Sequence, residues 1–379
     1  MLPLSAHPRL GLYYAMQANH FRQFSSIIRQ GIERLGFDRV LLVVLGAAVT
    51  VLFVLGMGKD LAGWDDSKTK VTFFQIGTGS TGGTYFPMGQ ALAAVISQPP
   101  GSDPCLPGGH CGVPGVVAIA KGSAGSVANV RAVASGRLES ALVQANVLAA
   151  AYAGTGEFEG EGPRENLRVI ANLYTEAIHL VVARGMDVRS VGDLKGMRVS
   201  IGPDGSGTRS DAIAILAAYG VTLQDIEPVE ADASRSAEMI LTGRLDAYFL
   251  VAGAPARSID DLAMRGAIDL VPIRGDAADQ LVLERAFYSR FSVPEGTYRH
   301  VEEIETLGIG ALWITRASTS DRLTYQITRA LFDERNHATL VSAHANGENV
   351  TASTAVRGVP ILLHPGAERF YFEAGILAR

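Results

Sequence analysis

The sequence has little cysteine and little charge, and each scarcity excludes a class of protein. The two cysteines among 379 residues, Cys105 and Cys111, have a spacing that suits neither a zinc knuckle nor a C-x-x-C redox pair. Lys and Arg number 33 against 38 Asp and Glu, which excludes the basic excess typical of a nucleic-acid-binding protein. Charged residues make up 19% and hydrophobic residues 47%, a balance that excludes a disordered chain. The length allows two or three domains.

The sequence also lacks the common catalytic motifs. It contains no G-x-S-x-G elbow, no H-E-x-x-H and no Walker loop. The eight histidines are scattered, and none pairs with another at helical ligand spacing beside a carboxylate. We therefore predict no catalytic residues, no metal site, no cofactor and no enzymatic activity.

One long apolar run lies near the N-terminus. Residues 40–58 carry no charge, and as a helix they would be ~28 Å long, close to the hydrocarbon thickness of a bilayer. Arginines dominate before the run and aspartates follow it, so residues 1–39 are predicted to be cytoplasmic and the remainder exported. The run fits either an uncleaved anchor or a signal segment cut after Gly58. The chain is predicted to be periplasmic, with residues 40–58 as a possible inner-membrane anchor.

The two cysteines flank a Pro- and Gly-rich loop. An exported chain meets oxidising conditions, so we predict a local disulfide between Cys105 and Cys111, with two free thiols as the alternative.

After residue 70, short apolar runs alternate with amphipathic stretches, which predicts an α/β fold with helices on both faces of a sheet. The extended stretch 171–185 and the strand-like 269–274 are interpreted as crossings between two lobes. Lobe 1 is then residues 70–173 and 271–379, and lobe 2 is residues 174–270. Strands are predicted at 71–76, 116–120, 140–143, 167–173, 178–183, 198–201, 247–250, 268–272 and 309–314, and helices at 85–96, 126–134, 211–219, 234–241 and 321–332.

Three glycine- and serine-rich turns each join a predicted strand to a predicted helix, within residues 74–85, 118–129 and 199–210. The first contains G-x-G-x-x-G at Gly77, Gly79 and Gly82, but no acidic residue ends a second strand about 20 residues later, as a dinucleotide fold requires. Backbone N–H groups at helix N-termini bind anions. For any one of these turns, the simpler interpretation is an ordinary helix N-cap. Because three such turns occur in two lobes, we predict that together they bind a small anion between the lobes.

These blocks resemble the TAXI family (TRAP-associated extracytoplasmic immunogenic proteins), which are solute-binding subunits of tripartite ATP-independent periplasmic (TRAP) transporters. The similarity covers about residues 71–377. The family usually has glutamate at the position of Ala128 and aspartate at that of Asn146, so the present cleft is less acidic. The matching blocks are 76–89 (IGTGSTGGTYFPMG), 125–129 with 142–146, 173–176 with 179–182, 193–196 with 199–208, 243–247 with 253–255, and 364–369.

The resemblance implies a two-lobed, type II periplasmic-binding-protein fold with a ligand cleft between the lobes. It also implies capture of a small organic anion, such as a dicarboxylate, glutamate or 2-oxoglutarate, and delivery to membrane permease subunits. No covalent chemistry is needed, because a ligand that touches both lobes stabilises their closed arrangement. The residues expected to bind the ligand are Ser80, Thr81, Gly82, Tyr85, Ser126, Asn129, Gln144, Glu176, Ser206, Gly207, Thr208, Arg209 and Pro255.

Two other functions are compatible with the sequence. A membrane-anchored ligand sensor would use the 39-residue N-terminal region and an uncleaved anchor, although that region carries no kinase or DNA-binding motif. An exported enzyme on the same fold would need a nucleophile–base set that the sequence does not supply.

Overall fold

The computed structural model describes residues 45–46, 50–51, 71–102 and 112–378. Residues 69–379 form one compact unit, distinct from residues 1–68. The predicted membrane segment falls largely outside the described residues, and Cys105 and Cys111 fall wholly outside them. Among the described residues, no helix has both the length and the apolar character needed to cross a bilayer.

The compact unit alternates strands and helices, as the hydrophobic pattern predicts. Its strands are β1 (Thr72–Gly77), β2 (Ser97–Gln98), β3 (Val113–Pro114), β4 (Val116–Lys121), β5 (Ser140–Gln144), β6 (Leu167–Ala183), β7 (Arg198–Ser200), β8 (Glu227–Val229), β9 (Ala247–Ala252), β10 (Ile268–Val271), β11 (Tyr288–Val293) and β12 (Ile304–Arg316). Its α-helices are α3 (Tyr85–Ile96), α4 (Ser126–Ala134), α5 (Ala145–Ala153), α6 (Gly207–Ala218), α7 (Ala233–Leu241), α8 (Arg257–Met264), α9 (Asp276–Glu284), α10 (Asp321–Leu331), α11 (Glu334–Ala343) and α12 (Pro365–Glu373).

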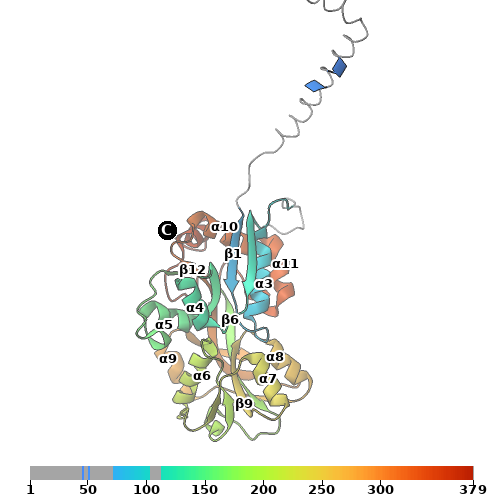
Figure 1. Ribbon diagram of the computed structural model, residues 1–379. Coiled ribbons are helices and arrows are strands. Elements are labelled where there is room, and N and C mark those ends of the chain that lie inside the picture. The colour runs from blue at the N-terminus through green and yellow to red at the C-terminus, as the bar shows by residue number, and fades with distance from the viewer. Residues whose placement is uncertain (1–44, 47–49, 52–70, 103–111, 379) are drawn as a thin grey trace, which may run out of the picture. The chain divides into compact units, whose positions relative to one another are not determined.

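Two lobes share one hydrogen-bonded sheet of order β4-β1-β5-β12-β6-β9-β7-β8, with β10 paired to β6 and β11 paired to β12. In Figure 1 the upper lobe holds β1, α3, α4 and α5, the lower lobe holds β9, α6, α7 and α8, and β6 runs through both. Strand β6 pairs with β12 from Leu167 to Ala177 and with β9 from Ala177 to Val182. The extended stretch predicted as a crossing, residues 171–185, therefore lies almost entirely within a single 17-residue strand, β6, which ends at Ala183.

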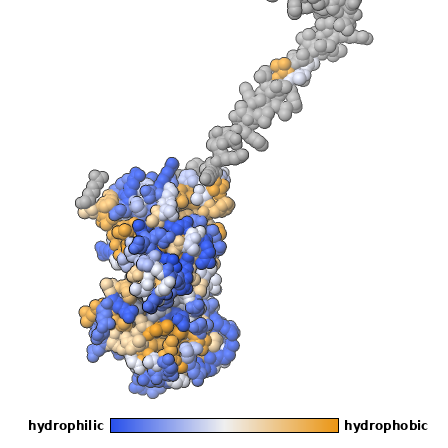
Figure 2. Space-filling view, turned by 60° about the vertical axis from the view of Figure 1, so that its left-hand side comes forward, coloured by the Kyte–Doolittle hydropathy of each residue, from blue (hydrophilic) through white to orange (hydrophobic). Residues whose placement is uncertain are grey.

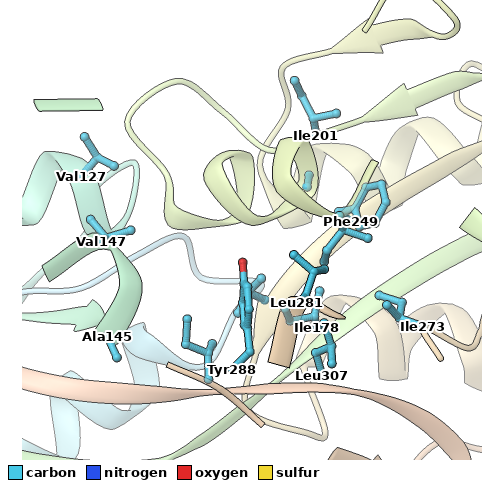
Figure 3. Packing of buried hydrophobic residues seen from close by; sticks show 14 of the residues in the cluster. Val127, Ala145, Val147, Ile178, Ile201, Phe249, Ile273, Leu281, Tyr288 and Leu307 are labelled. Atoms are coloured by element: carbon cyan, nitrogen blue, oxygen red, sulfur yellow. The ribbon is translucent and has the colours of Figure 1, made fainter. Parts of the chain in front are cut away.

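The sequence explains why these strands lie inside. All five residues of β5 and all six of β9 are buried, as expected for central strands covered on both faces. One apolar cluster extends through both lobes: Figure 3 shows Val127 and Val147 of the upper lobe, Ile201 and Phe249 of the lower lobe, and Ile178 of β6. Hydrophilic residues occupy much of the visible surface of the unit in Figure 2, with a hydrophobic area on the lower lobe.

The predicted elements agree with the structure apart from three kinds of difference. The two strands predicted at 167–173 and 178–183 are one strand, because the polar residues between them are paired rather than looped out. Helix α6 begins at Gly207 rather than at 211, because Ser206 caps it by accepting a hydrogen bond from the Arg209 N–H at 3.1 Å. The elements predicted from the sequence do not include β2, β3, β8, β11, α5, α8, α9, α11 and α12.

Candidate functional site

The three glycine- and serine-rich turns meet around one cavity. The first lies between β1 and α3, the second between β4 and α4, and the third between β7 and α6, so two come from the upper lobe and one from the lower. The cavity encloses about 70 Å³. It is lined by Gly79, Ser80, Gly83, Thr84, Tyr85, Ala124, Gly125, Ser126, Gln144, Glu176, Pro203, Ser206, Gly207, Thr208, Asp232, Ala233, Leu250 and Val251.

Five helices begin at this cavity. The residue that precedes the first turn of each helix lines the cavity. These residues are Thr84 of α3, Gly125 of α4, Gln144 of α5, Ser206 of α6 and Asp232 of α7. No side chain caps the N-termini of α3, α4 or α5. The first N–H groups of a helix have no partner within the helix, and the helix dipole makes this end partially positive. The walls of the cavity therefore favour an anionic or hydrogen-bond-accepting group.

The charged side chains at the cavity are acidic. Among the described residues that line it there is no lysine, arginine or histidine, and the two carboxylates are Glu176 and Asp232. Asp232 caps its own helix by accepting a hydrogen bond from the Arg235 N–H at 2.9 Å. Glu176 is thus the acidic group that is not committed to a helix terminus.

Glu176 lies near the middle of β6 and is 1% exposed. The Tyr85 hydroxyl donates a hydrogen bond to its Oε2 at 2.7 Å. Burial raises the pKa of Glu176 to about 8, with the Tyr85 hydrogen bond acting in the opposite direction and the nearby Asp211 carboxyl adding to the increase. The glutamate is therefore largely an un-ionised acid at neutral pH in this closed arrangement.

The lobes are joined by direct hydrogen bonds. The Ala128 N–H donates to the Gly205 carbonyl at 3.0 Å, and the Ser258 N–H donates to the Gly82 carbonyl at 3.1 Å. The Thr84 hydroxyl donates to the Gly253 carbonyl at 2.8 Å. The structure therefore represents a closed form, in which groups from both lobes surround the cavity.

The sequence profile of the NMT1-like family matches residues 76–375, which is most of the chain and includes every cavity-lining residue. The chain belongs to the NMT1-like family.

Several solved solute-binding proteins resemble this NMT1-like chain at low sequence identity. The alkanesulfonate-binding protein SsuA from Xanthomonas axonopodis pv. citri, bound to MOPS, is 15% identical with a TM-score of 0.41, over 79% of this chain and 83% of that one. The periplasmic aliphatic sulphonate-binding protein SsuA from Escherichia coli is 14% identical with a TM-score of 0.42, over 79% and 82%. A TctC solute-binding protein from Polaromonas is 15% identical with a TM-score of 0.42, over 82% and 98%.

The structure of this NMT1-like protein brings eight of the thirteen expected ligand residues to the cavity: Ser80, Tyr85, Ser126, Gln144, Glu176, Ser206, Gly207 and Thr208. Gly207 has a clear steric role there. A Cβ added at Gly207 would overlap Gln144 Oε1 and would lie 3.1 Å from Ser126 Oγ. A glycine at this position lets α6 of the lower lobe approach the upper lobe.

The other five expected residues lie elsewhere. Asn129 is buried, and its Nδ2 donates to the Thr78 and Leu142 carbonyls at 2.6 and 2.7 Å, so its amide ties the first turn to β5. Arg209 directs its guanidinium at Glu230, 3.2 Å away. Thr81 and Gly82 line a neighbouring surface cavity, and the Pro255 carbonyl is 2.9 Å from His344 Nε2.

Sequence reasoning did not select ten of the lining residues. Thr84 and Gly125 fall within the quoted turns, so the motifs contained the signal for them. Asp232 precedes the predicted helix 234–241, where an aspartate indicates an N-cap. No local sequence signal marks Leu250 and Val251 as cavity residues, because the pairing of β9 with β6 brings them to the cavity.

Proposed function

We propose that this protein is a solute-binding protein that captures a small organic anion between its two lobes. The observation that carries the proposal is the convergence of five helix N-termini and several hydroxyl groups, from both lobes, on one small cavity. Open α/β sheets bind ligands beyond the carboxyl ends of their strands, and β1, β4 and β7 end at this cavity.

The resemblance to the TAXI family supports a finer proposal. The protein would act in the periplasm, held there after cleavage at Gly58 or anchored by residues 40–58, and would deliver its ligand to the membrane permease subunits of a TRAP transporter. Sulfonate binding by the SsuA proteins is a property of those proteins. For this chain we propose a carboxylate, because the TAXI ligands include dicarboxylates, glutamate and 2-oxoglutarate.

Capture needs no chemical step. The cavity is lined by Ser80 and Ser126 from the upper lobe and by Thr208 from the lower lobe. A ligand in contact with both lobes adds its binding free energy to the closed form alone, so the population shifts toward closure. Release to a permease then corresponds to reopening.

The test is thermal unfolding of the full chain, purified in detergent, against succinate, pyruvate, lactate, 2-oxoglutarate, L-glutamate and L-alanine. A ligand at about 100 times its dissociation constant stabilises the folded state by ~2.7 kcal/mol, which raises the melting temperature. A rise with at least one of these compounds is the expected result. No rise with any of them, in protein shown by mass spectrometry to carry no copurified small molecule, would overturn the proposal.

A further inference from the structure

Glu176 occupies an unusual position for a carboxyl group in an anion site. It lines the cavity, it is 1% exposed, and the hydrogen bond it receives from Tyr85 engages only Oε2. Among the described residues that line the cavity, no cation is available to neutralise it. An ionised carboxylate in such surroundings is costly, since burial of an unpaired charge is strongly unfavourable.

The side chains that face Glu176 in the described part of the chain carry no positive charge. Tyr85 of α3 contributes a hydroxyl, and Tyr174 of β6 contributes a second, buried hydroxyl that has no hydrogen-bond partner among the described residues. Asp211 of α6, itself 0% exposed, and Asp232 at the start of α7 add further acidic groups. Burial and the neighbouring Asp211 carboxyl therefore favour the protonated form of Glu176, against the opposing effect of the Tyr85 hydrogen bond.

A protonated Glu176 changes what the cavity offers. With its proton in place the side chain is a hydrogen-bond donor, like the helix N–H groups and the serine and threonine hydroxyls around it. A cavity of donors is complementary to a carboxylate. An ionised Glu176 would instead accept hydrogen bonds and would suit an ammonium group.

We infer that Glu176 binds the ligand as an un-ionised carboxylic acid, donating its proton to a ligand carboxylate oxygen, so that the site takes up an organic acid anion together with one proton. This inference rests on the proposed function and narrows the class of ligand that the protein is proposed to bind. The preferred ligands are keto, hydroxy or plain carboxylic acids rather than the amino acids with the same carbon skeleton.

The cavity is small, with a volume of about 70 Å³, which favours a short ligand such as pyruvate or lactate. Within each pair of equal carbon skeleton, the amino acid carries an ammonium group that a protonated Glu176 cannot accept. The expected order is therefore pyruvate or lactate above L-alanine, and 2-oxoglutarate above L-glutamate.

Calorimetric titration of the full chain from pH 5.5 to 9.5 tests the inference, with pyruvate and L-alanine as one matched pair and 2-oxoglutarate and L-glutamate as the other. The dissociation constant of the keto acid should increase with pH. The increase should approach tenfold per pH unit above the pKa of Glu176 in the unliganded protein. In that range, titrations in buffers of different ionisation enthalpy should show close to one proton taken up per ligand bound.

Three variants identify the group responsible. Glu176→Gln keeps a hydrogen-bond donor without a titratable proton, so it should bind the keto acid at pH 6 within a few-fold of wild type and lose the pH dependence. Glu176→Ala removes the donor and should weaken binding more than tenfold relative to Glu176→Gln. Asp232→Asn, which changes the other carboxylate of the cavity but retains a helix cap, should keep the wild-type dependence on pH.

The outcomes separate the two proposals. Binding that strengthens with rising pH, a preference for the amino acids, or equal affinities of the Gln and Ala variants would each overturn the role of Glu176 while leaving solute binding intact. Failure of every probe to bind wild-type protein at any pH would overturn the proposed function itself.

Discussion

Closure of the two lobes depends on Gly207, and a single methyl group at this position tests whether the closed arrangement is the ligand-bound form. In the structure a Cβ at Gly207 overlaps Gln144 Oε1 and lies 3.1 Å from Ser126 Oγ. Gln144 is 3% exposed, so its amide has little space to move except into the cavity. Gly207→Ala therefore either opposes closure or takes space from the ligand.

The magnitude follows from the cost of overpacking. Inserting a methylene-sized group into a well-packed region costs about 1–3 kcal/mol. Because this cost falls on the closed form, the dissociation constant should increase about fivefold to 150-fold. Gly207 is the first residue of α6 and its φ is not positive, so alanine there introduces no backbone strain. The unliganded protein should accordingly unfold at a temperature no lower than that of wild type.

The assay is isothermal titration with the acid that most raises the melting temperature, paired with thermal unfolding of the unliganded protein. Gly122→Ala is the matched control, because a Cβ there meets nothing closer than the Gly79 carbonyl at 3.6 Å. An affinity of Gly207→Ala equal to that of wild type and of the control would refute the reasoning. The ligand would then be bound with the lobes further apart than they are here.

Three further predictions address the residues around the cavity. Asn129→Ala should lower the free energy of unfolding, measured in urea, by about 1–3 kcal/mol, because it leaves the Thr78 and Leu142 carbonyls without their side-chain donor. An unchanged free energy of unfolding would contradict this role of Asn129. Tyr85→Phe should weaken ligand binding in a titration at pH 6, because it removes the hydroxyl that donates a hydrogen bond to Glu176 at 2.7 Å. Tyr325→Phe is the control and should leave binding unchanged, because the Tyr325 hydroxyl bonds Glu373 on the surface. Burial raises the pKa of Asp211 to about 7, so its contribution to stability is complete below its ordinary pKa near 4 and is lost as the pH increases through about 7. Between pH 4 and 8 the wild type should therefore lose stability relative to Asp211→Asn, on the order of a few kcal/mol, and parallel urea-denaturation profiles for the two proteins would contradict this.

Local sequence signals predicted the strands and helices that carry the site, but not all of its chemistry. The turns around Ser80, Ser126 and Ser206 were visible because glycine and serine mark the start of a helix after a strand. Helix α5 was missed, since Gln144 is not a typical cap residue and the helix follows β5 without a break.

The charge of the site depends on partners that are distant in sequence, and residue type alone does not reveal those partners. Arg209 follows the third turn and was expected to meet an anion, yet it pairs with Glu230, 3.2 Å away on a neighbouring segment. Asn129 follows the second turn and is used to bridge two backbone carbonyls. Glu176 was selected from its place at the crossing, but its protonation depends on burial by both lobes, which only the assembled fold provides.

The pairing of β12 with β5 and β6 has a consequence for the order in which the chain can fold. Ala311 pairs with Gln144, and Trp313 of the same strand packs against Phe74 of β1. The upper lobe thus lacks its central strand until residues 304–316 are available, and contacts between segments so far apart in sequence form slowly. Until those residues arrive the chain stays incompletely folded, with one edge of β5 unpaired.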